Sequence, residues 1–300
     1  MNARTILVLC AALPIVAMSG CESAGALKGM EIGGVDIGQL AENVGGLREI
    51  KEPEEIQMGQ GVAETLLGAA APLDDPELQR YVNAVGRWVA LQSERPDLPW
   101  HFAVNSSDVV NAAATPGGNI IITKGMLRVL RNESELAGVL GHEAAHVVRK
   151  HHLNAIRKGA FVALLAQGAQ AAAHGSENEE LVRSLIGPTK ELYARGLDKT
   201  DEFEADRMGV VLATRAGYDP WGLPNAVQTL SSIKPDDNVV ALLFKTHPTP
   251  SARLERLAAA MGASFDAMTG AQNPERYLRI TQRVRAALDT RARYAVLANR

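Results

Sequence analysis

The sequence predicts an α+β fold that is mainly helical and contains one small antiparallel sheet. Aromatic residues make up only 4% of the chain while alanine is frequent, and alanine favours helices more than any other residue. Several segments carry apolar residues at helical spacing, whereas a few short segments rich in valine and isoleucine have the pattern of strands. With 300 residues, 46% of them hydrophobic, the chain can bury the core of one moderate domain with short attachments.

The beginning of the chain has the pattern of an export signal. Arg4 precedes an apolar run over residues 5–18, and residues 1–20 are predicted to form a signal peptide. The Met-Ser-Gly before Cys21 resembles a bacterial lipobox, which predicts that Cys21 is lipidated and attaches the protein to a membrane. The alternative is ordinary signal cleavage that leaves Cys21 as a spare thiol. Because Cys10 lies inside the signal, the exported protein would keep one cysteine and form no internal disulfide.

The rest of the chain divides into a linker, a domain and a terminal segment. Residues 21–49 are rich in glycine and small residues, which predicts a flexible linker. The folded domain is expected over residues 50–270. It begins with a helix over residues 53–68, and Asp75-Pro76 then starts a second helix with apolar residues at helical spacing. Residues 271–300 are predicted to form a basic amphipathic helical segment that packs on the domain or on a partner.

Three strands are expected after the second helix, at residues 100–105, 109–114 and 120–123. The turn residues Thr115-Pro116-Gly117-Gly118 connect the second strand to the third, and we expect a small antiparallel sheet. Further along, residues 155–173 are apolar but interrupted by charged and amide side chains. This run is too short to span a bilayer cleanly, so it is predicted to be a soluble helix or one that lies at an interface.

The best-marked helix follows the third strand. Asn132 is expected to cap its start, with Glu135 at the capping-box position, and Arg149 and Lys150 are expected in its last turn. Glycine and alanine make the middle of this helix slim, so that neighbouring backbones can approach it closely; these small residues are Gly138, Gly141, Ala144 and Ala145.

This helix also carries two histidines and a glutamate in a His-Glu-x-x-His pattern. His142 and His146 are one turn apart on one face, so their imidazoles can bind a single metal ion. Glu143 lies about 100° round the helix, where a carboxylate can reach water at the metal. Zinc peptidases require this arrangement. The alternative is a histidine pair satisfied by hydrogen bonds, but a chance match in a chain of this length has odds of about one in a hundred.

A catalytic zinc site needs a third protein ligand and an open fourth position. One candidate is His152, but if the helix continues this residue lies about 15 Å from His142 along the axis and faces elsewhere. The better candidate is Glu202, because Asp206 shares its helix face and can accept the free ring N–H of a ligand histidine. Glu204 points away from that face.

Four segments in order resemble the gluzincin metallopeptidases of the CAAX prenyl protease, HtpX and BepA group, peptidase family M48. They are NAAATPGGNIIITKGML, ELAGVLGHEAAHVVRKHH, DEFEADRMG and HPTPSARLERL. The resemblance implies a zincin-like domain with one Zn²⁺ held by His142, His146 and Glu202, with Glu143 as the catalytic glutamate and Asp206 behind a ligand. Family members often have Ser-Arg before the ligand glutamate, where this chain has Asp198-Lys199. The compact periplasmic lipoproteins of the group are the expected relatives.

Two further residues follow from the resemblance. His247, in the segment Thr-His-Pro-Thr-Pro, matches a family histidine that can approach the zinc, and Arg253 follows six residues later. Either residue could stabilise the oxyanion of the reaction, or His247 could occupy the fourth metal position and hold the enzyme latent. A histidine before proline is otherwise an ordinary residue of a surface loop.

The implied function is a zinc metalloendopeptidase that acts in protein quality control of the cell envelope. The substrate is expected to lie extended against Asn111, Ala112, Ala113 and Ala114, which favours unfolded or misassembled envelope proteins as substrates. Glu22 after Cys21 predicts anchoring at the outer membrane, facing the periplasm, where assembly machinery could be a partner. With a net charge of −3 and no basic run, nucleic acid is not an expected partner.

Two other functions stay open at this point. A zinc-binding chaperone or assembly factor could keep the same ligands while its peptidase activity is latent. Glu143 argues against complete loss of the chemistry, because a purely structural site needs only the ligands. A purely structural lipoprotein would leave the histidines and acids unexplained.

Overall fold

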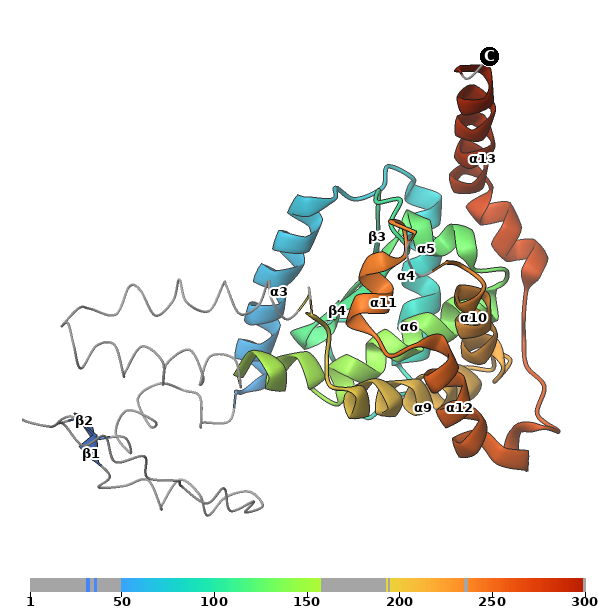
Figure 1. Cartoon of the computed structure of the whole chain (residues 1–300). Helices are drawn as coiled ribbons and strands as arrows, with labels where there is room; N and C mark the ends of the chain where they lie inside the picture. The colour runs from blue at the N-terminus through green and yellow to red at the C-terminus, as the bar shows by residue number, and fades with distance from the viewer. Residues whose placement is uncertain are drawn as a thin grey trace, which may run out of the picture.

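The structure is a computed structural model, and it describes residues 31–32, 35–36, 50–157, 193, 195–234 and 237–298. The predicted signal peptide, Cys21, most of the predicted linker and residues 158–173 of the predicted apolar helix lie outside the described residues. Within the linker range, β1 (Glu31–Ile32) and β2 (Val35–Asp36) pair antiparallel. Figure 1 shows the domain that the remaining residues form.

Helices make up most of the domain, which confirms the mainly helical α+β prediction. The predicted helix over 53–68 is α3, and the helix predicted from Asp75-Pro76 is α4, capped by the Asp75 carboxylate through the N–H of Leu78. The helices are α3 (Glu52–Ala69), α4 (Pro76–Ala90), α5 (Lys124–Val129), α6 (Glu133–Val148), α9 (Lys199–Arg215), α10 (Gly222–Ser231), α11 (Ala241–Thr246), α12 (Pro250–Met261) and α13 (Pro274–Ala298).

The sheet has three strands, and one of its two pairings differs from the prediction. The strands β3 (His101–Asn105), β4 (Ala112–Thr115) and β5 (Asn119–Thr123) lie in the order β3-β5-β4. β4 and β5 are antiparallel as expected, but β3 and β5 are parallel, so the fully antiparallel sheet was wrong. The most apolar strand, β5, takes the buried centre, because a central strand can bury both of its faces. β4 is therefore left at an edge.

α6 begins where it was predicted to begin but ends earlier than predicted. The Asn132 side chain accepts from the backbone N–H of Glu135 at 2.9 Å. Glu135 does not return a bond to Asn132, because its carboxylate accepts from the backbone N–H of Arg131 at 2.7 Å. The helix ends at Val148, and Lys150 has a left-handed backbone with φ of 58°. Arg149 and Lys150 thus follow the last turn rather than form it.

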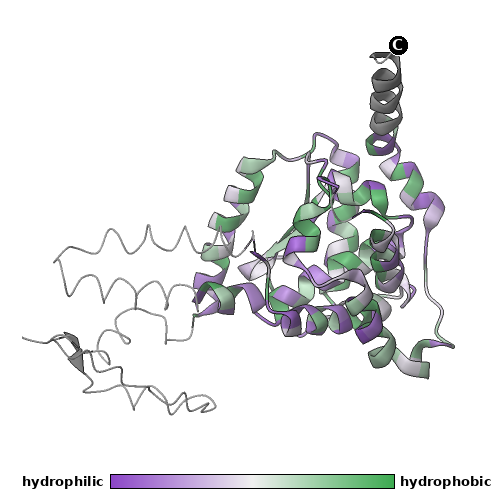
Figure 2. Ribbon diagram, in the orientation of Figure 1, coloured by the Kyte–Doolittle hydropathy of each residue, from purple (hydrophilic) through white to green (hydrophobic). Residues whose placement is uncertain are grey.

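α6 is buried along its whole length, and its small residues allow this. A Cβ on Gly138 would lie 2.6 Å from the backbone nitrogen of Leu223, at the start of α10. A Cβ on Gly141 would lie 2.9 Å from the carbonyl oxygen of Gly209 in α9. The backbones of α9 and α6 are therefore in direct contact. This agrees with the prediction that the small residues of α6 allow neighbouring backbones to approach. Figure 2 shows hydrophobic residues concentrated where the helices meet the sheet.

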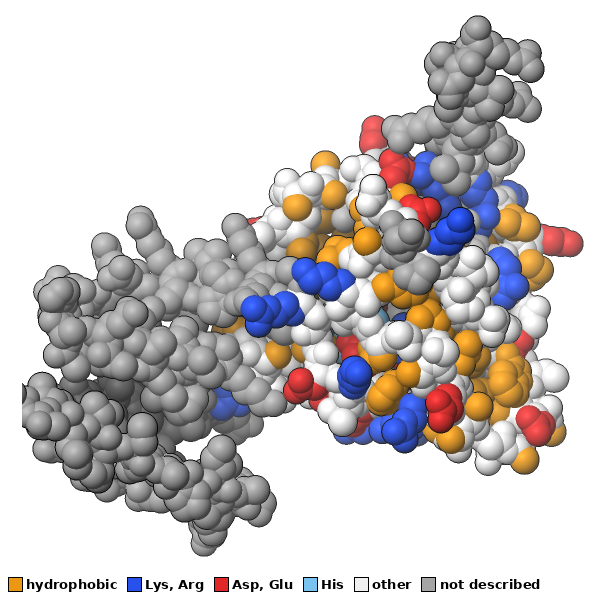
Figure 3. All heavy atoms as spheres, viewed as in Figure 1, with side chains coloured by type: hydrophobic (Ala, Val, Ile, Leu, Met, Phe, Trp, Pro, Cys, Tyr) orange, Lys and Arg blue, Asp and Glu red, His pale blue; other side chains and the backbone are white. Residues whose placement is uncertain are grey.

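α13 begins on the body of the domain and then leaves it (Figure 1). Its first turns are anchored by Tyr277, which is fully buried and donates its hydroxyl to the carbonyl of Leu127 at 2.6 Å. Figure 3 shows Lys and Arg side chains gathered where α13 leaves the body, in keeping with the basic segment that was predicted. Among the helices that the structure describes, none has the length and apolar character needed to cross a bilayer.

We expect Gly209→Ala to lower the free energy of unfolding by about 1–3 kcal/mol, because the new methyl group would meet the backbone of His142. A Cβ at position 209 would lie 2.7 Å from the backbone nitrogen of His142. Gly61→Ala is the matched control, since Gly61 is exposed in α3 and nothing lies within 4 Å of where its Cβ would be. That control should raise stability by about 0.5–1 kcal/mol. Chemical denaturation measures both changes, and equal effects would contradict the tight contact.

Candidate metal centre

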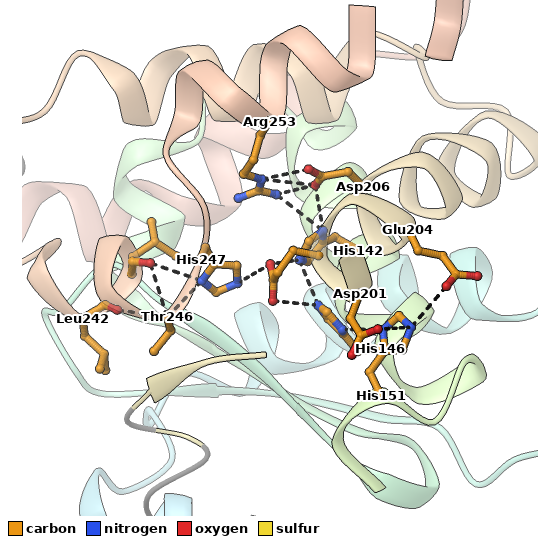
Figure 4. Close-up of polar contacts among 12 residues, drawn as sticks. His142, His146, His151, Asp201, Glu204, Asp206, Leu242, Thr246, His247 and Arg253 are labelled. Carbon is orange, nitrogen blue, oxygen red and sulfur yellow. Dashed lines mark hydrogen bonds and ion pairs between the residues drawn. The ribbon is translucent and has the colours of Figure 1, made fainter. Parts of the chain in front are cut away.

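Two helices bring the predicted metal ligands together. α6 supplies His142 and His146, whose Nε2 atoms lie 3.1 Å apart, and α9 supplies Glu202. One carboxylate oxygen of Glu202 lies 3.6 Å from Nε2 of His142, and the other lies 3.7 Å from Nε2 of His146. All three side chains are buried. Figure 4 shows the two histidines pointing into the same small space between the helices.

The donor set fits a zinc ion. Ligands bound tetrahedrally at about 2.0–2.2 Å are separated from one another by about 3.3 Å, close to the spacings found here. Oε2 of Glu202 is buried and has no hydrogen-bond partner within the described part of the chain. A buried carboxylate oxygen without a donor is costly, and a cation bound among these side chains would remove that cost.

Asp206 and Arg253 support His142 from behind. Oδ1 of Asp206 lies 2.9 Å from Nδ1 of His142, as the sequence predicted for a carboxylate that orients a ligand. Arg253, in α12, donates its Nε to Oδ2 of Asp206 at 3.0 Å. Burial lowers the pKa of His142, but the neighbouring carboxylates of Asp206 and Glu202 outweigh burial and raise this pKa to about 9. The carboxylates thus make the site attractive to positive charge.

Glu143 is buried beside the ligands, and its carboxylate faces the backbone N–H of Ala114 in β4. Burial, followed by the charge of Glu202, raises the pKa of Glu143 to about 7, although the charge of His142 lowers it. A carboxylate with a pKa near neutrality can both accept and return a proton. The structure therefore places Glu143 where the sequence required a general base.

His247 also reaches the site, from the turn after α11. Its Nε2 lies 3.6 Å from Oε2 of Glu202, and one donor atom each from His142, Glu202 and His247 lie within 4.8 Å of one another. Because His146 is also close to His142 and Glu202, four donor groups converge. Arg253 is buried as well, but its guanidinium is bound to Asp206. In this structure Arg253 is therefore a partner of that carboxylate.

The position predicted for His152 was wrong. The left-handed turn at Lys150 ends α6, and residues 151–157 start a new helical segment. The His152 ring consequently lies 5.3 Å from the ring of His146, whereas on a continuous helix it would lie about 9 Å further along the axis and face elsewhere. It stacks on Tyr193 with ring centres 5.0 Å apart. Burial lowers the pKa of His152 to about 3, so the ring is neutral beside the metal ligands.

The predicted substrate-binding residues lie in and just before the edge strand: β4 contains Ala112, Ala113 and Ala114, and Asn111 directly precedes it. Thr123 of β5 donates its N–H to the carbonyl of Asn111 at 3.0 Å, so in an antiparallel ladder Ala112 and Ala114 direct their backbone groups to the open edge. At this edge the carboxylate of Glu143 faces the N–H of Ala114, and the Tyr193 hydroxyl donates to the carbonyl of Ala114 at 2.7 Å. Tyr193 was not predicted, since nothing in its local sequence marks it.

Two pockets flank the site, and they share Ala112, Glu143 and His247. The first pocket is apolar, and its lining includes Met126, Val139, Leu223, Val227, Leu230 and Leu243. The second is polar, and its lining includes Asn111, His146, His152, Tyr193, Glu202 and Thr246. The edge strand, the predicted base and the metal ligands thus border one cleft with an apolar side and a polar side.

Comparison with known proteins gives the site a context. Residues 76–261 match the model of peptidase family M48. Over 208 residues the chain is 30% identical to the beta-barrel assembly-enhancing protease of Escherichia coli K12, covering 67% of this chain and 42% of that protein. It is 29% identical over 189 residues to the mitochondrial metalloendopeptidase OMA1 of Arabidopsis thaliana, covering 63% and 37%. It is 30% identical over 160 residues to the metalloprotease YcaL of Escherichia coli K12, covering 53% and 61%.

We expect Asp206→Asn to weaken zinc binding by about 10–100-fold, because the His142 ring loses the anionic acceptor that orients it. The same change leaves the buried Arg253 guanidinium without its counter-charge, and it should lower stability by about 3–5 kcal/mol. Asp198→Asn is a suitable control, since Asp198 is exposed at the start of the same helix and makes no capping bond. Chelator competition and denaturation measure the two effects. Unchanged zinc affinity would refute this role of Asp206.

Proposed function

The chain belongs to peptidase family M48, and on this premise we propose that it is a zinc-dependent endopeptidase acting on unfolded or misassembled proteins of the cell envelope. The observation that carries the proposal is the convergence of His142, His146 and Glu202 beside Glu143 and the open edge of β4. Ligands, base and substrate edge then stand within one cleft. The matched region is about 42% of the length of the beta-barrel assembly-enhancing protease, so activity and substrates are proposed for this chain itself.

The proposed chemistry assigns separate tasks to the chain's own residues. His142, His146 and Glu202 would hold Zn²⁺, which when bound supplies Lewis acidity for activating water and the peptide carbonyl. Glu143 takes a proton from the attacking water and returns it to the amine that leaves, so that one water molecule is consumed for each peptide bond cleaved. Asp206 keeps the ring of His142 in the orientation that binding requires.

The edge strand selects the conformation of the substrate. A peptide that adds to β4 must be extended over several residues, because it pairs through its backbone. Folded proteins rarely expose such a segment, whereas unfolded and misassembled ones do. The pocket beside Glu143 and His247 has a mainly apolar lining, which favours an apolar side chain next to the bond that is cleaved. Its cavity volume is only about 20 Å³, so it would have to widen to receive one. Such side chains are buried in folded proteins.

Location and partners are proposed from the sequence signals and from the relatives. The predicted signal peptide and lipidation of Cys21 support attachment to a membrane of the cell envelope, and Glu22 supports the periplasmic face of the outer membrane. The name of the Escherichia coli relative connects that protein with beta-barrel assembly. We extend this to the present chain as a proposal: it meets its substrates, and the assembly machinery as a potential partner, at that membrane.

His247 favours a second function, in which the same protein binds zinc and holds its peptidase activity latent. Its Nδ1 lies 3.2 Å from the carbonyl of Leu243, which can accept a hydrogen bond but cannot donate one. A neutral ring that keeps its proton on Nδ1 and donates it to this carbonyl presents the lone pair of Nε2 to Glu202 and the metal site. A lone pair suits a fourth metal ligand, whereas stabilising an oxyanion would require a proton there.

We expect Glu143→Gln to lower the cleavage of casein by about 10²–10⁴-fold while the protein still binds one zinc ion, because glutamine cannot accept the proton of water. Residues 22–300 loaded with zinc serve as the reference, with zinc content measured for both proteins. Glu64→Gln is the control, since Glu64 is exposed on α3, away from the metal centre. Equal cleavage by wild type and Glu143→Gln would rule out this base, and zinc in neither protein would rule out the site.

We expect His247→Ala to increase the zinc-dependent cleavage of a short unstructured peptide by at least about threefold, because it opens the fourth position of the site. The measurement is initial rate at equal zinc loading. Thr246→Val is the neighbouring control, since it keeps the ring and removes only a hydroxyl near Nδ1. A decrease in rate for His247→Ala would instead assign His247 to stabilisation of the oxyanion.

A further inference from the structure

His146 needs an acceptor for its second ring nitrogen if Nε2 is to bind a metal ion. A histidine ligand commonly donates its other N–H to a fixed partner, which sets both the tautomer and the ring orientation. For His142 this partner is Asp206. No acceptor was predicted for His146 from the sequence, and the carboxylates of Glu202 and Asp206 are already engaged elsewhere in the site.

The structure places the ring of His151 in this position. Nδ1 of His151 lies 3.0 Å from Nδ1 of His146, the ring centres are 5.1 Å apart, and both residues are buried. Because Nε2 of His146 faces His142 and Glu202, the ring proton of His146 belongs on Nδ1. Nδ1 of His151 must then be the acceptor. Figure 4 shows the two rings side by side.

Two acidic side chains face the other nitrogen of His151. Its Nε2 lies 3.5 Å from Oε2 of Glu204 and 3.9 Å from Oδ1 of Asp201. Both acids belong to α9, the helix that also supplies Glu202. Carboxylates accept but do not donate, so they favour the tautomer of His151 with its proton on Nε2. This tautomer leaves the lone pair on Nδ1, where the N–H of His146 arrives.

The left-handed backbone of Lys150 allows His151 to reach His146. On a continuous helix, a residue five positions after His146 would lie about 140° away around the axis. The positive φ of Lys150 ends α6 and turns the chain back, and Lys150 is held there by a backbone bond to the carbonyl of Val147 at 3.0 Å. The backbone thus brings His151 under the second ligand of the site.

We propose that His151 is a positioning residue of the metal centre, which accepts the Nδ1 proton of His146 while Glu204 and Asp201 hold its own tautomer. The inference rests on the proposed function, because it takes His146 as a metal ligand through Nε2. It goes further by giving each histidine ligand its own partner: a carboxylate for His142, and a histidine backed by carboxylates for His146.

Zinc affinity of the full chain, measured by competition with a chromophoric chelator, tests this role. We expect His151→Leu to bind zinc about 10–100-fold more weakly than wild type. His151→Asn should recover most of the affinity, because its amide oxygen can accept near the former Nδ1. His152→Leu is the matched control: its ring also lies close to His146, but its Nδ1 has no hydrogen-bond partner among the described residues. Its affinity should stay within about threefold of wild type.

Denaturation of the metal-free proteins separates positioning from packing. Loss of packing lowers the stability of both His151 variants, whereas a positioning role predicts that leucine alone loses zinc affinity. If His151→Leu does not fold, His151→Asn is compared with His151→Gln, whose amide extends to the position of Nε2 and should fail to restore affinity. Equal zinc affinity across the His151 variants would overturn the inference and leave the proposed function standing. Absence of zinc from the wild-type protein would instead overturn the proposed function.

Discussion

α6 and α9 pass one another at Gly141 and Gly209 with no side chain between their backbones, and the metal centre depends on this contact. The two predicted ligands of α6 and the glutamate of α9 are about sixty residues apart in the chain, yet their donor atoms lie within 3.7 Å. A larger residue at either glycine would meet the backbone of the other helix and push the two helices apart. The packing of the two helices therefore sets the positions of the predicted ligands. Because these ligands include a carboxylate, the same packing also brings negative charge into the protein interior.

The buried carboxylates near this contact are compensated by neighbouring side chains. The carboxylates of Glu202 and Asp206 are fully enclosed, and isolated buried carboxylates would be very costly. Arg253 compensates Asp206, while the imidazoles of His142 and His247 surround Glu202. Burial raises the pKa of Glu202, but the surrounding side chains of His247, His142 and Arg253 outweigh burial and hold this pKa down at about 2. The carboxylate thus stays ionised inside the protein and available to a cation.

Much of this arrangement was predictable because it depends on local signals. The cap at Asn132, the spacing of His142 and His146 on one helix, and the shared face of Glu202 and Asp206 are all fixed by helical periodicity. What escaped prediction depends on the backbone leaving a regular path or on distant pairing. The left-handed backbone of Lys150 is not predicted by its residue type. This backbone conformation brings His151 and His152 to the site. The parallel pairing of β3 with β5 depends on which strand is buried most, and a single strand cannot reveal that.

The edge of β4 has one more consequence, for the protein's own solubility. An open strand edge pairs with any extended chain, and a second copy of the same protein offers such an edge just as a substrate does. Here the Tyr193 hydroxyl already donates to the carbonyl of Ala114, so this point of the edge is not free to pair with a second copy. The same groups that border the cleft therefore also limit pairing between copies of the chain through this edge.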